Sequence, residues 1–301
     1  MVEVEQQSTE IRLSVPWGHV AAKTYGSSTG KLVLVVHGRL DNAGSFTRLM
    51  KYLPKELFYY VCIDLPGHGW SSHFPSWMIL DVMDYIHALY FILEALQWKT
   101  FIYIGHSLGA QIAVIFNTFH PNRIEKLISI DGILMNPTIF KKFTTYFKNA
   151  SAFSLKAYHK EKPLSFTREE ILHALKTIRF GGILNSEAVD ALFERAVTEV
   201  NGKYIYNRDI RLKNHPFTFM QINECQMFNS MFSVPTYLVI PSHGIIFAHK
   251  QLYMLVSETI KTKTTLEVIH IDGNHHVHNN NPEKVAPFIC KILNSNYSSK
   301  L

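Results

Sequence analysis

Short apolar runs alternate with longer stretches of helical periodicity through the first 131 residues. The segment 31–37 is a continuous apolar run, which is typical of a central strand buried on both faces of a parallel sheet. Further strands of this kind are predicted at 59–64, 101–105 and 126–131, and helices between them at 45–53, 79–96 and 108–119. An earlier hairpin is predicted from 11–15 and 20–25. This alternation predicts an α/β fold with a mostly parallel central sheet flanked by helices.

The pattern changes after Asp131 and returns at Val234. Residues 133–233 are rich in helix formers and aromatic residues, and no clear strand is predicted there. Thr167 and Glu170 form a capping box that predicts a helix start. Beyond Val234, strands are predicted at 236–240 and 266–271, and helices at 247–259 and 283–293.

The chain is therefore expected to comprise a core of residues 1–132 and 234–301, interrupted by a helical cap insert of residues 133–233. An insert of this length is usually a lid or a binding element.

Composition excludes several classes of protein. The 301 residues are 47% hydrophobic, which is enough for one large core, and the three cysteines make a disulfide framework improbable. The net charge is +6, but its basic residues are scattered rather than arranged in a stripe. We therefore expect attraction of anionic substrates rather than nucleic-acid binding. No apolar run is long enough for a membrane span.

The last three residues, Ser299-Lys300-Leu301, are the tripeptide that directs proteins to peroxisomes. The polar residues before them, within a tail of residues 295–301, are expected to be flexible enough for a receptor to reach. The predicted partner is the peroxisomal import receptor, and the predicted location is the peroxisome, with the cytoplasm as a further location.

Gly105-His106-Ser107-Leu108-Gly109 fits the G-x-S-x-G pattern between a predicted strand and a predicted helix. The pattern places a serine on a tight, strained turn, where its hydroxyl stands clear at the sheet edge. Side chains at 105 and 109 would collide with the neighbouring strand and helix. The pattern therefore predicts that Ser107 is a nucleophile.

The segment His37-Gly38-Arg39 follows a predicted central strand. The backbone N–H groups of Arg39 and Leu108 are expected to form an oxyanion hole, since backbone donors aimed at a developing negative charge stabilise it. We expect His37, Gly38 and His106 to line the substrate site.

A histidine loop, Gly273-Asn274-His275-His276, follows the last predicted strand. His275 is the predicted general base, with His276 and His278 as rivals. No carboxylate or cysteine stands at ligand spacing in this loop, so neither a metal nor any other cofactor is expected.

The acid of the triad is harder to assign, because the segment 239–247 contains no Asp or Glu and His243 occupies the usual position. Three interpretations remain open. Asp131, at the end of the strand beside the nucleophile strand, could act as the acid. The enzyme could instead work with a Ser–His dyad, or catalysis could be lost.

These motifs resemble those of the animal serine hydrolase-like proteins, within the α/β-hydrolase superfamily. The resemblance runs nearly end to end and rests on the opening segment 15–23, the segments 37–46 and 64–69, the serine pentapeptide 105–109 and the histidine loop 273–278. It implies a serine hydrolase with a helical cap and a peroxisomal or perinuclear location. This chain departs from the family pattern at Arg39, where Trp is usual, and at His243, where an acidic residue is usual.

The expected reaction is acyl transfer to water from a small-molecule ester or thioester through an acyl-enzyme on Ser107. Acyl-CoA thioesters or other anionic acyl compounds fit the peroxisomal signal and the basic cap. The alternative is a catalytically impaired binding protein that keeps the fold.

Overall fold

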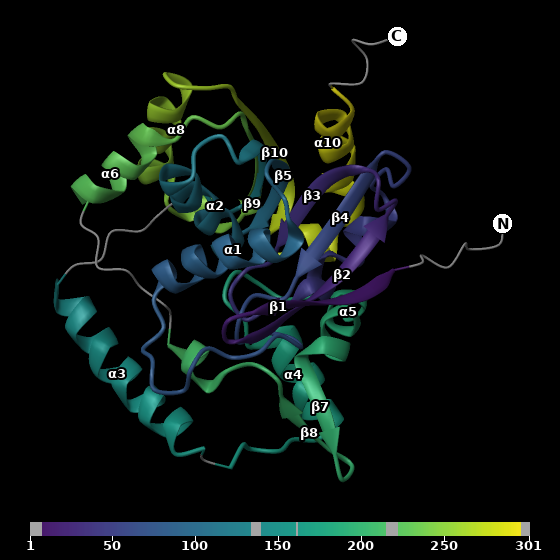
Figure 1. Cartoon of the computed structure of the whole chain (residues 1–301), viewed down its shortest axis with the longest axis vertical. Helices are drawn as coiled ribbons and strands as arrows, with labels where there is room; N and C mark the ends of the chain where they lie inside the picture. Colours follow the sequence, from purple (N-terminus) through teal and green to yellow (C-terminus); the bar gives the residue numbers. More distant parts are fainter. Residues whose placement is uncertain (1–7, 134–139, 161, 215–221, 296–301) are drawn as a thin grey trace.

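The computed structural model describes residues 8–133, 140–160, 162–214 and 222–295, and Figure 1 shows their arrangement. Its main feature is an eight-stranded sheet with the order β1-β2-β4-β3-β5-β6-β9-β10. The pairs β1–β2 and β2–β4 are antiparallel, and the remaining pairs are parallel. The strands are β1 (Thr9–Val15), β2 (Gly18–Gly26), β3 (Lys31–Val36), β4 (Phe58–Ile63), β5 (Phe101–His106), β6 (Ile124–Ile130), β9 (Thr236–His243) and β10 (Leu266–Asn274). The predicted mostly parallel sheet is confirmed.

Strand β3 shows why this sheet must be covered on both faces. Leu34 and Val36 belong to one apolar cluster, and Val33 and Val35 belong to another, all of them fully buried. Alternate side chains of a strand point to opposite faces, so each face needs its own layer of helices. The first cluster includes residues of α1 (Val82–Leu96), α2 (Leu108–Phe119) and α8 (Lys250–Lys261), and the second includes residues of α10 (Pro282–Asn294).

Three helix predictions need correction. The predicted helix 45–53 is instead two 3₁₀ turns, Ala43–Phe46 and Leu49–Lys51. The Asn42 side chain caps the first turn, and the residues of that turn are all buried. Helix α1 begins later than predicted because Asp81 forms a capping box. The predicted helix 247–259 is divided into α7 (Ile245–Ala248) and α8.

The insert contains α3 (Phe140–Tyr158), α4 (Arg168–Thr177), α5 (Ser186–Ala196) and α6 (Ile222–Met231), and the capping box of Thr167 and Glu170 is confirmed. The expectation of no strand was wrong, because β7 (Val197–Val200) and β8 (Lys203–Tyr206) form a hairpin. Its turn is Asn201-Gly202, and both residues have positive φ angles, of 52° and 72°. This dipeptide is the strongest short hairpin signal, and it was overlooked.

The insert is attached to the core in two ways. Helix α6 lies beside α8 (Figure 1), and the ring of its Phe228 is 5.8 Å from that of Phe119 on α2. Helices α4 and α5 have a small apolar cluster of their own. They are joined to the core by Arg195, whose Nη2 donates to Asp64 Oδ2 at 2.7 Å in a fully buried ion pair.

The carboxyl-terminal tripeptide 299–301 lies outside the described residues. Within the described part of the chain, no helix combines the length and the apolar character that a membrane crossing requires. Cys62, Cys225 and Cys290 are all free thiols.

Candidate active site

Ser107 occupies the turn between β5 and α2, with φ 52° and ψ −117°. This is a strained conformation for a residue other than glycine. Its two flanking glycines leave no room for a side chain, since a Cβ on Gly105 would lie 2.7 Å from the backbone nitrogen of Ala110 and one on Gly109 would lie 2.8 Å from the carbonyl oxygen of His37. The structure therefore has the tight turn that the pentapeptide predicts.

Two backbone N–H groups near this turn have no acceptor in the part of the chain that the structure describes. Leu108 is the first residue of α2, so its N–H has no partner within the helix, and neither it nor the N–H of Arg39 donates a hydrogen bond among the described residues. Gly38 lets the Arg39 loop approach, because a Cβ there would lie 3.1 Å from Ser107 Cβ. The arrangement can hold an oxyanion beside Ser107.

His275 donates from Nδ1 to Oδ2 of Asp131 at 2.6 Å, and both side chains are buried. The Asp131 carboxylate also accepts the backbone N–H groups of Ile245 at 2.7 Å and Ile246 at 3.0 Å. Of the three interpretations of the acid, the first is therefore the one that this geometry favours. The carboxylate both orients the imidazole and fixes the start of α7.

Neighbouring strands bring Asp131 close to the nucleophile. Strand β6 pairs in parallel with β5, and the backbone N–H of Ser107 donates to the carbonyl oxygen of Ile130 at 3.0 Å. The carbonyl oxygen of His275 accepts Nε2–H of His106 at 2.9 Å. His106, which precedes Ser107 in the chain, is thus bonded to His275. Asp131, which binds the same histidine, follows the strand beside that of Ser107.

Burial lowers the pKa of His275, and the neighbouring His106 lowers it further, while Asp131 opposes both effects. The imidazole is therefore neutral at neutral pH, and its Nδ1 proton is committed to Asp131. Nε2 is then free to accept a proton, as a general base must. The Ser107 hydroxyl makes no hydrogen bond among the described residues, which is common in the absence of substrate because catalytic contacts tighten when substrate binds.

The histidine at the usual position of the acid and the two alternatives for the base make other contacts or none. His243 is exposed and contacts Ser242 Oγ at 2.9 Å, so it does not take the position of the acid. His276 donates to the carbonyl oxygen of Phe180 at 3.0 Å. Neither nitrogen of His278 has a hydrogen-bond partner among the described residues.

His37 is positioned to support the loop rather than to contact a ligand. It is fully buried, its Nδ1–H donates to the carbonyl oxygen of Gly38 at 2.7 Å, and its Nε2 accepts from Leu65 at 3.0 Å. Burial lowers its pKa to about 4, so it stays neutral. His106 is also fully buried, and its contact with His275 gives it a similar supporting place.

No role was predicted for the cap segment that contacts the histidine loop. The backbone N–H of His275 donates to the carbonyl oxygen of Gly181 at 3.1 Å, and the Phe180 ring lies 6.3 Å from the His275 ring. Arg179, in the same segment, forms an ion pair with Asp41 beside the oxyanion loop. The adjacent glycines of this segment, Gly181 and Gly182, have positive φ angles of 88° and 117° and were the available signal in the sequence.

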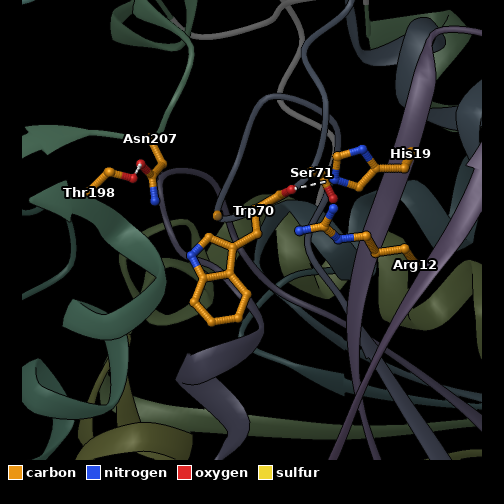
Figure 2. Close-up of a pocket in the computed structure, with 7 residues that line it drawn as sticks. Arg12, His19, Trp70, Ser71, Thr198 and Asn207 are labelled. Atoms are coloured by element: carbon orange, nitrogen blue, oxygen red, sulfur yellow. Dashed lines mark hydrogen bonds between the residues drawn. The ribbon is translucent and has the colours of Figure 1, made fainter.

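A separate surface pocket of about 480 Å³ lies between the core and the insert hairpin. Figure 2 shows Arg12, His19 and Trp70 on its core side and Thr198 and Asn207 on its insert side. None of the residues proposed for catalysis lines it.

A serine on a strained turn, a histidine and a carboxylate at the carboxyl edge of a parallel sheet define a protein of the hydrolase class. The α/β-hydrolase-fold family model matches residues 31–282, so the chain belongs to this family. Within it, the chain belongs to the serine hydrolase-like proteins, because it is 31% identical to a serine hydrolase-like protein of Danio rerio, over 96% of this chain and 90% of that protein.

Two further comparisons agree. Serine hydrolase-like protein 2 of Homo sapiens is 31% identical, with 95% of this chain and 94% of that protein covered. The crystal structure of a hypothetical protein from Pseudomonas aeruginosa matches with a TM-score of 0.82 at 27% identity, over 96% of this chain and 99% of that one. Fold and relatives together support a hydrolase.

Proposed function

We propose that this chain hydrolyses a carboxylic ester or thioester through an acyl-enzyme on Ser107. The observation that carries the proposal is the hydrogen bond between His275 and Asp131, made beside the strained serine turn. A neutral, oriented imidazole next to a serine at a helix start is the arrangement that activates a hydroxyl for nucleophilic attack.

In the first half of the reaction, Ser107 Oγ attacks the substrate carbonyl carbon while His275 Nε2 takes the hydroxyl proton. The N–H groups of Arg39 and Leu108 bind the oxyanion that forms. The tetrahedral intermediate then expels the alcohol or thiol, which receives the proton from His275.

In the second half, water attacks the acyl carbon and gives a proton to His275. Collapse of the second tetrahedral intermediate releases the carboxylic acid, and the proton returns to Ser107 Oγ. Asp131 keeps its negative charge throughout and stabilises the imidazolium in both halves.

Three arginines near the proposed oxyanion hole, Arg39, Arg208 and Arg179, support an anionic substrate. Arg39 lies next to the proposed oxyanion hole, and its Nη1 donates to the carbonyl oxygen of Leu212 at 3.1 Å. The Arg208 guanidinium lies 4.2 Å from the centre of the Tyr206 ring. Burial lowers the pKa of Arg39, and repulsion from Arg208 and Arg179 lowers it further, so these charges are close together.

Among the described residues, neither Arg39 nor Arg208 forms an ion pair with a carboxylate. Unpaired guanidinium groups are suited to binding a carboxylate or a phosphate. We therefore extend the proposal to acyl substrates that carry such a group, with acyl-CoA thioesters as the first to test.

The contact between Asp131 and His275 favours the enzyme over the catalytically impaired binding protein, because that alternative rested on a missing carboxylate. A fluorophosphonate probe tests the choice directly, since it reacts with an activated serine. The wild-type protein should be labelled at Ser107, and a folded Ser107→Ala variant should not. Folded wild-type protein that resists the probe, or labelling that persists in the variant, would contradict the proposal.

The location is a separate proposal, supported by Ser299-Lys300-Leu301. A fluorescent protein fused to the amino terminus should accumulate in peroxisomes, and deletion of the three residues should leave it in the cytoplasm. The same distribution for both fusions would contradict recognition by the peroxisomal import receptor.

A further inference from the structure

Asp41, His106 and His278 come from three separate segments of the chain, and their side chains meet in the interior of the core. Asp41 follows the oxyanion segment, His106 precedes the nucleophile, and His278 lies in α9 (Val277–Asn280), three residues after His275. His106 and His278 are fully buried, and Asp41 is 5% exposed. One possible ligand atom from each residue lies within 4.8 Å of the other two. We propose that these three residues bind a divalent transition-metal ion of the Zn²⁺ type.

The hydrogen bonds of His106 leave its second ring nitrogen, Nδ1, without a partner among the described residues. Its Nε2 lies 2.9 Å from the carbonyl oxygen of His275, which can only accept, so Nε2–H donates to that oxygen. Nδ1 faces Asp41 Oδ2 at 3.6 Å, which is longer than a hydrogen bond. The ring nitrogen and the carboxylate oxygen thus face each other without a hydrogen bond between them.

His278 brings further nitrogens without hydrogen-bond partners to the same place. Neither of its nitrogens has a hydrogen-bond partner among the described residues, and Nδ1 of His106 has none either. The His278 ring is held between that of His106, at 4.1 Å between centres, and that of Phe46, at 4.9 Å. Buried polar atoms without partners are rare in folded proteins, so this concentration of them points to a bound ligand.

Two imidazole nitrogens and one carboxylate oxygen are a donor set that suits Zn²⁺. A tetrahedral site with bonds near 2.0 Å places its ligand atoms about 3.3 Å apart, which is close to the separation between His106 and Asp41. The outer nitrogen of His106 donates to a backbone carbonyl, which is the usual way to orient a metal-binding histidine. Arg179 occupies the other oxygen of Asp41 and keeps that carboxylate charged.

The role of such an ion is positional. His275 uses Nδ1 for Asp131, so the catalytic imidazole is not one of the ligands. The ion would instead join the loop that carries the oxyanion donor, the strand that ends at the nucleophile, and the loop that carries the base. It would hold these three segments in register without touching the reacting atoms.

The test is the metal content of the full-length protein. Because the cluster is buried and an added ion would have to reach it through the folded core, Zn²⁺ or Co²⁺ is supplied during expression. The ions that remain bound after desalting are then counted by mass spectrometry. The wild-type protein should retain one ion per chain, and its Co²⁺ form should show the visible absorption of a tetrahedral site. A His278→Leu variant should lose the ion, and a His249→Leu variant, which changes an exposed histidine, should keep it.

Thermal unfolding gives an independent readout. Metal should raise the melting temperature of the wild-type protein by several degrees and leave that of the His278 variant unchanged. If His278→Leu does not fold, His278→Asn replaces it in both measurements. Wild-type protein that retains neither metal, or a folded His278 variant that retains as much as wild type, would overturn the proposal and leave an ordered water as the occupant.

Fluorophosphonate labelling of the same samples separates this inference from the proposed function. Protein that is labelled at Ser107 but holds no metal would overturn only the metal site. Protein that holds one metal ion but resists the probe would support the metal site and contradict only the hydrolase mechanism.

Discussion

The backbone N–H of His275 donates to the carbonyl oxygen of Gly181, a residue of the insert, at 3.1 Å. Asn274 repeats the connection, since its side-chain amide donates to the carbonyl oxygen of Ile183 at 2.8 Å. The segment that carries the proposed base is therefore bonded to the cap by both backbone and side chain. A displacement of this part of the cap would displace the imidazole.

Gly181→Ala tests this dependence. Gly181 has a φ of +88°, and a Cβ there would lie 2.8 Å from ring carbons of His275, so the methyl group must push the imidazole aside. We expect the rate of labelling by a fluorophosphonate to fall roughly tenfold or more, because misplacing a catalytic group by about 1 Å has a large effect. Gly202→Ala is the matched control, since its φ is +72° but nothing lies within 4 Å. Equal rates in the two variants would show that the cap does not position the base.

Asp131→Asn should lower kcat roughly 10⁴-fold, because the amide cannot stabilise the imidazolium and favours the wrong tautomer. His243→Asp should leave kcat unchanged, since His243 is exposed and makes its contact with Ser242 instead of with His275. Steady-state kinetics of both variants on one ester substrate is the measurement. A large gain from His243→Asp would show that the acid is missing and that Asp131 does not act as one.

The pH dependence of labelling should follow the lowered pKa of His275, which lies below the usual 6.5. The reactive form is the neutral imidazole, so the rate should stay high as the pH falls through 6.5 and should decline only at lower pH. Asp131 raises the pKa, so its loss in Asp131→Asn should move the midpoint further toward acid. A midpoint above 6.5 in the wild-type protein would contradict the assignment of His275 as a buried base.

Arg208→Gln should weaken the binding of anionic substrates. We expect KM for an acyl-CoA thioester to rise roughly tenfold, which corresponds to about 1.4 kcal/mol for one charged contact, with little change for a neutral ester. Arg168→Gln is the control, because Arg168 also lies over an aromatic ring of the insert, at 5.1 Å from Phe193, but is exposed. A parallel rise for both substrates would indicate a structural role for Arg208.

Arg195→Met should cost about 3–5 kcal/mol in the free energy of unfolding, since it leaves Asp64 charged and unpaired in the core. Urea unfolding measures this cost. Lys291→Met removes an exposed ion pair with Glu267 and should cost at most about 1 kcal/mol. Similar costs for the two variants would mean that the buried pair does not hold the insert to the core.

The central strands and Ser107 could be predicted because their signals are local. An apolar run between turns, or a serine between two glycines after a strand, needs no knowledge of distant residues. Asp131 was only one of three possibilities, since its contact with His275 joins positions 144 residues apart. The cluster of Asp41, His106 and His278 depends on the meeting of a loop, the end of β5 and α9, which no local pattern encodes.

The position of Asp131 has one more consequence. The segment after β9 contributes only two backbone N–H groups to this carboxylate, and any residue other than proline can supply such a group. The side chains of His243, Phe247 and His249 are exposed and can diverge without changing the acid. A screen that requires Asp or Glu after this strand would discard this chain as inactive, although the carboxylate that reaches the histidine directly follows the neighbouring strand β6.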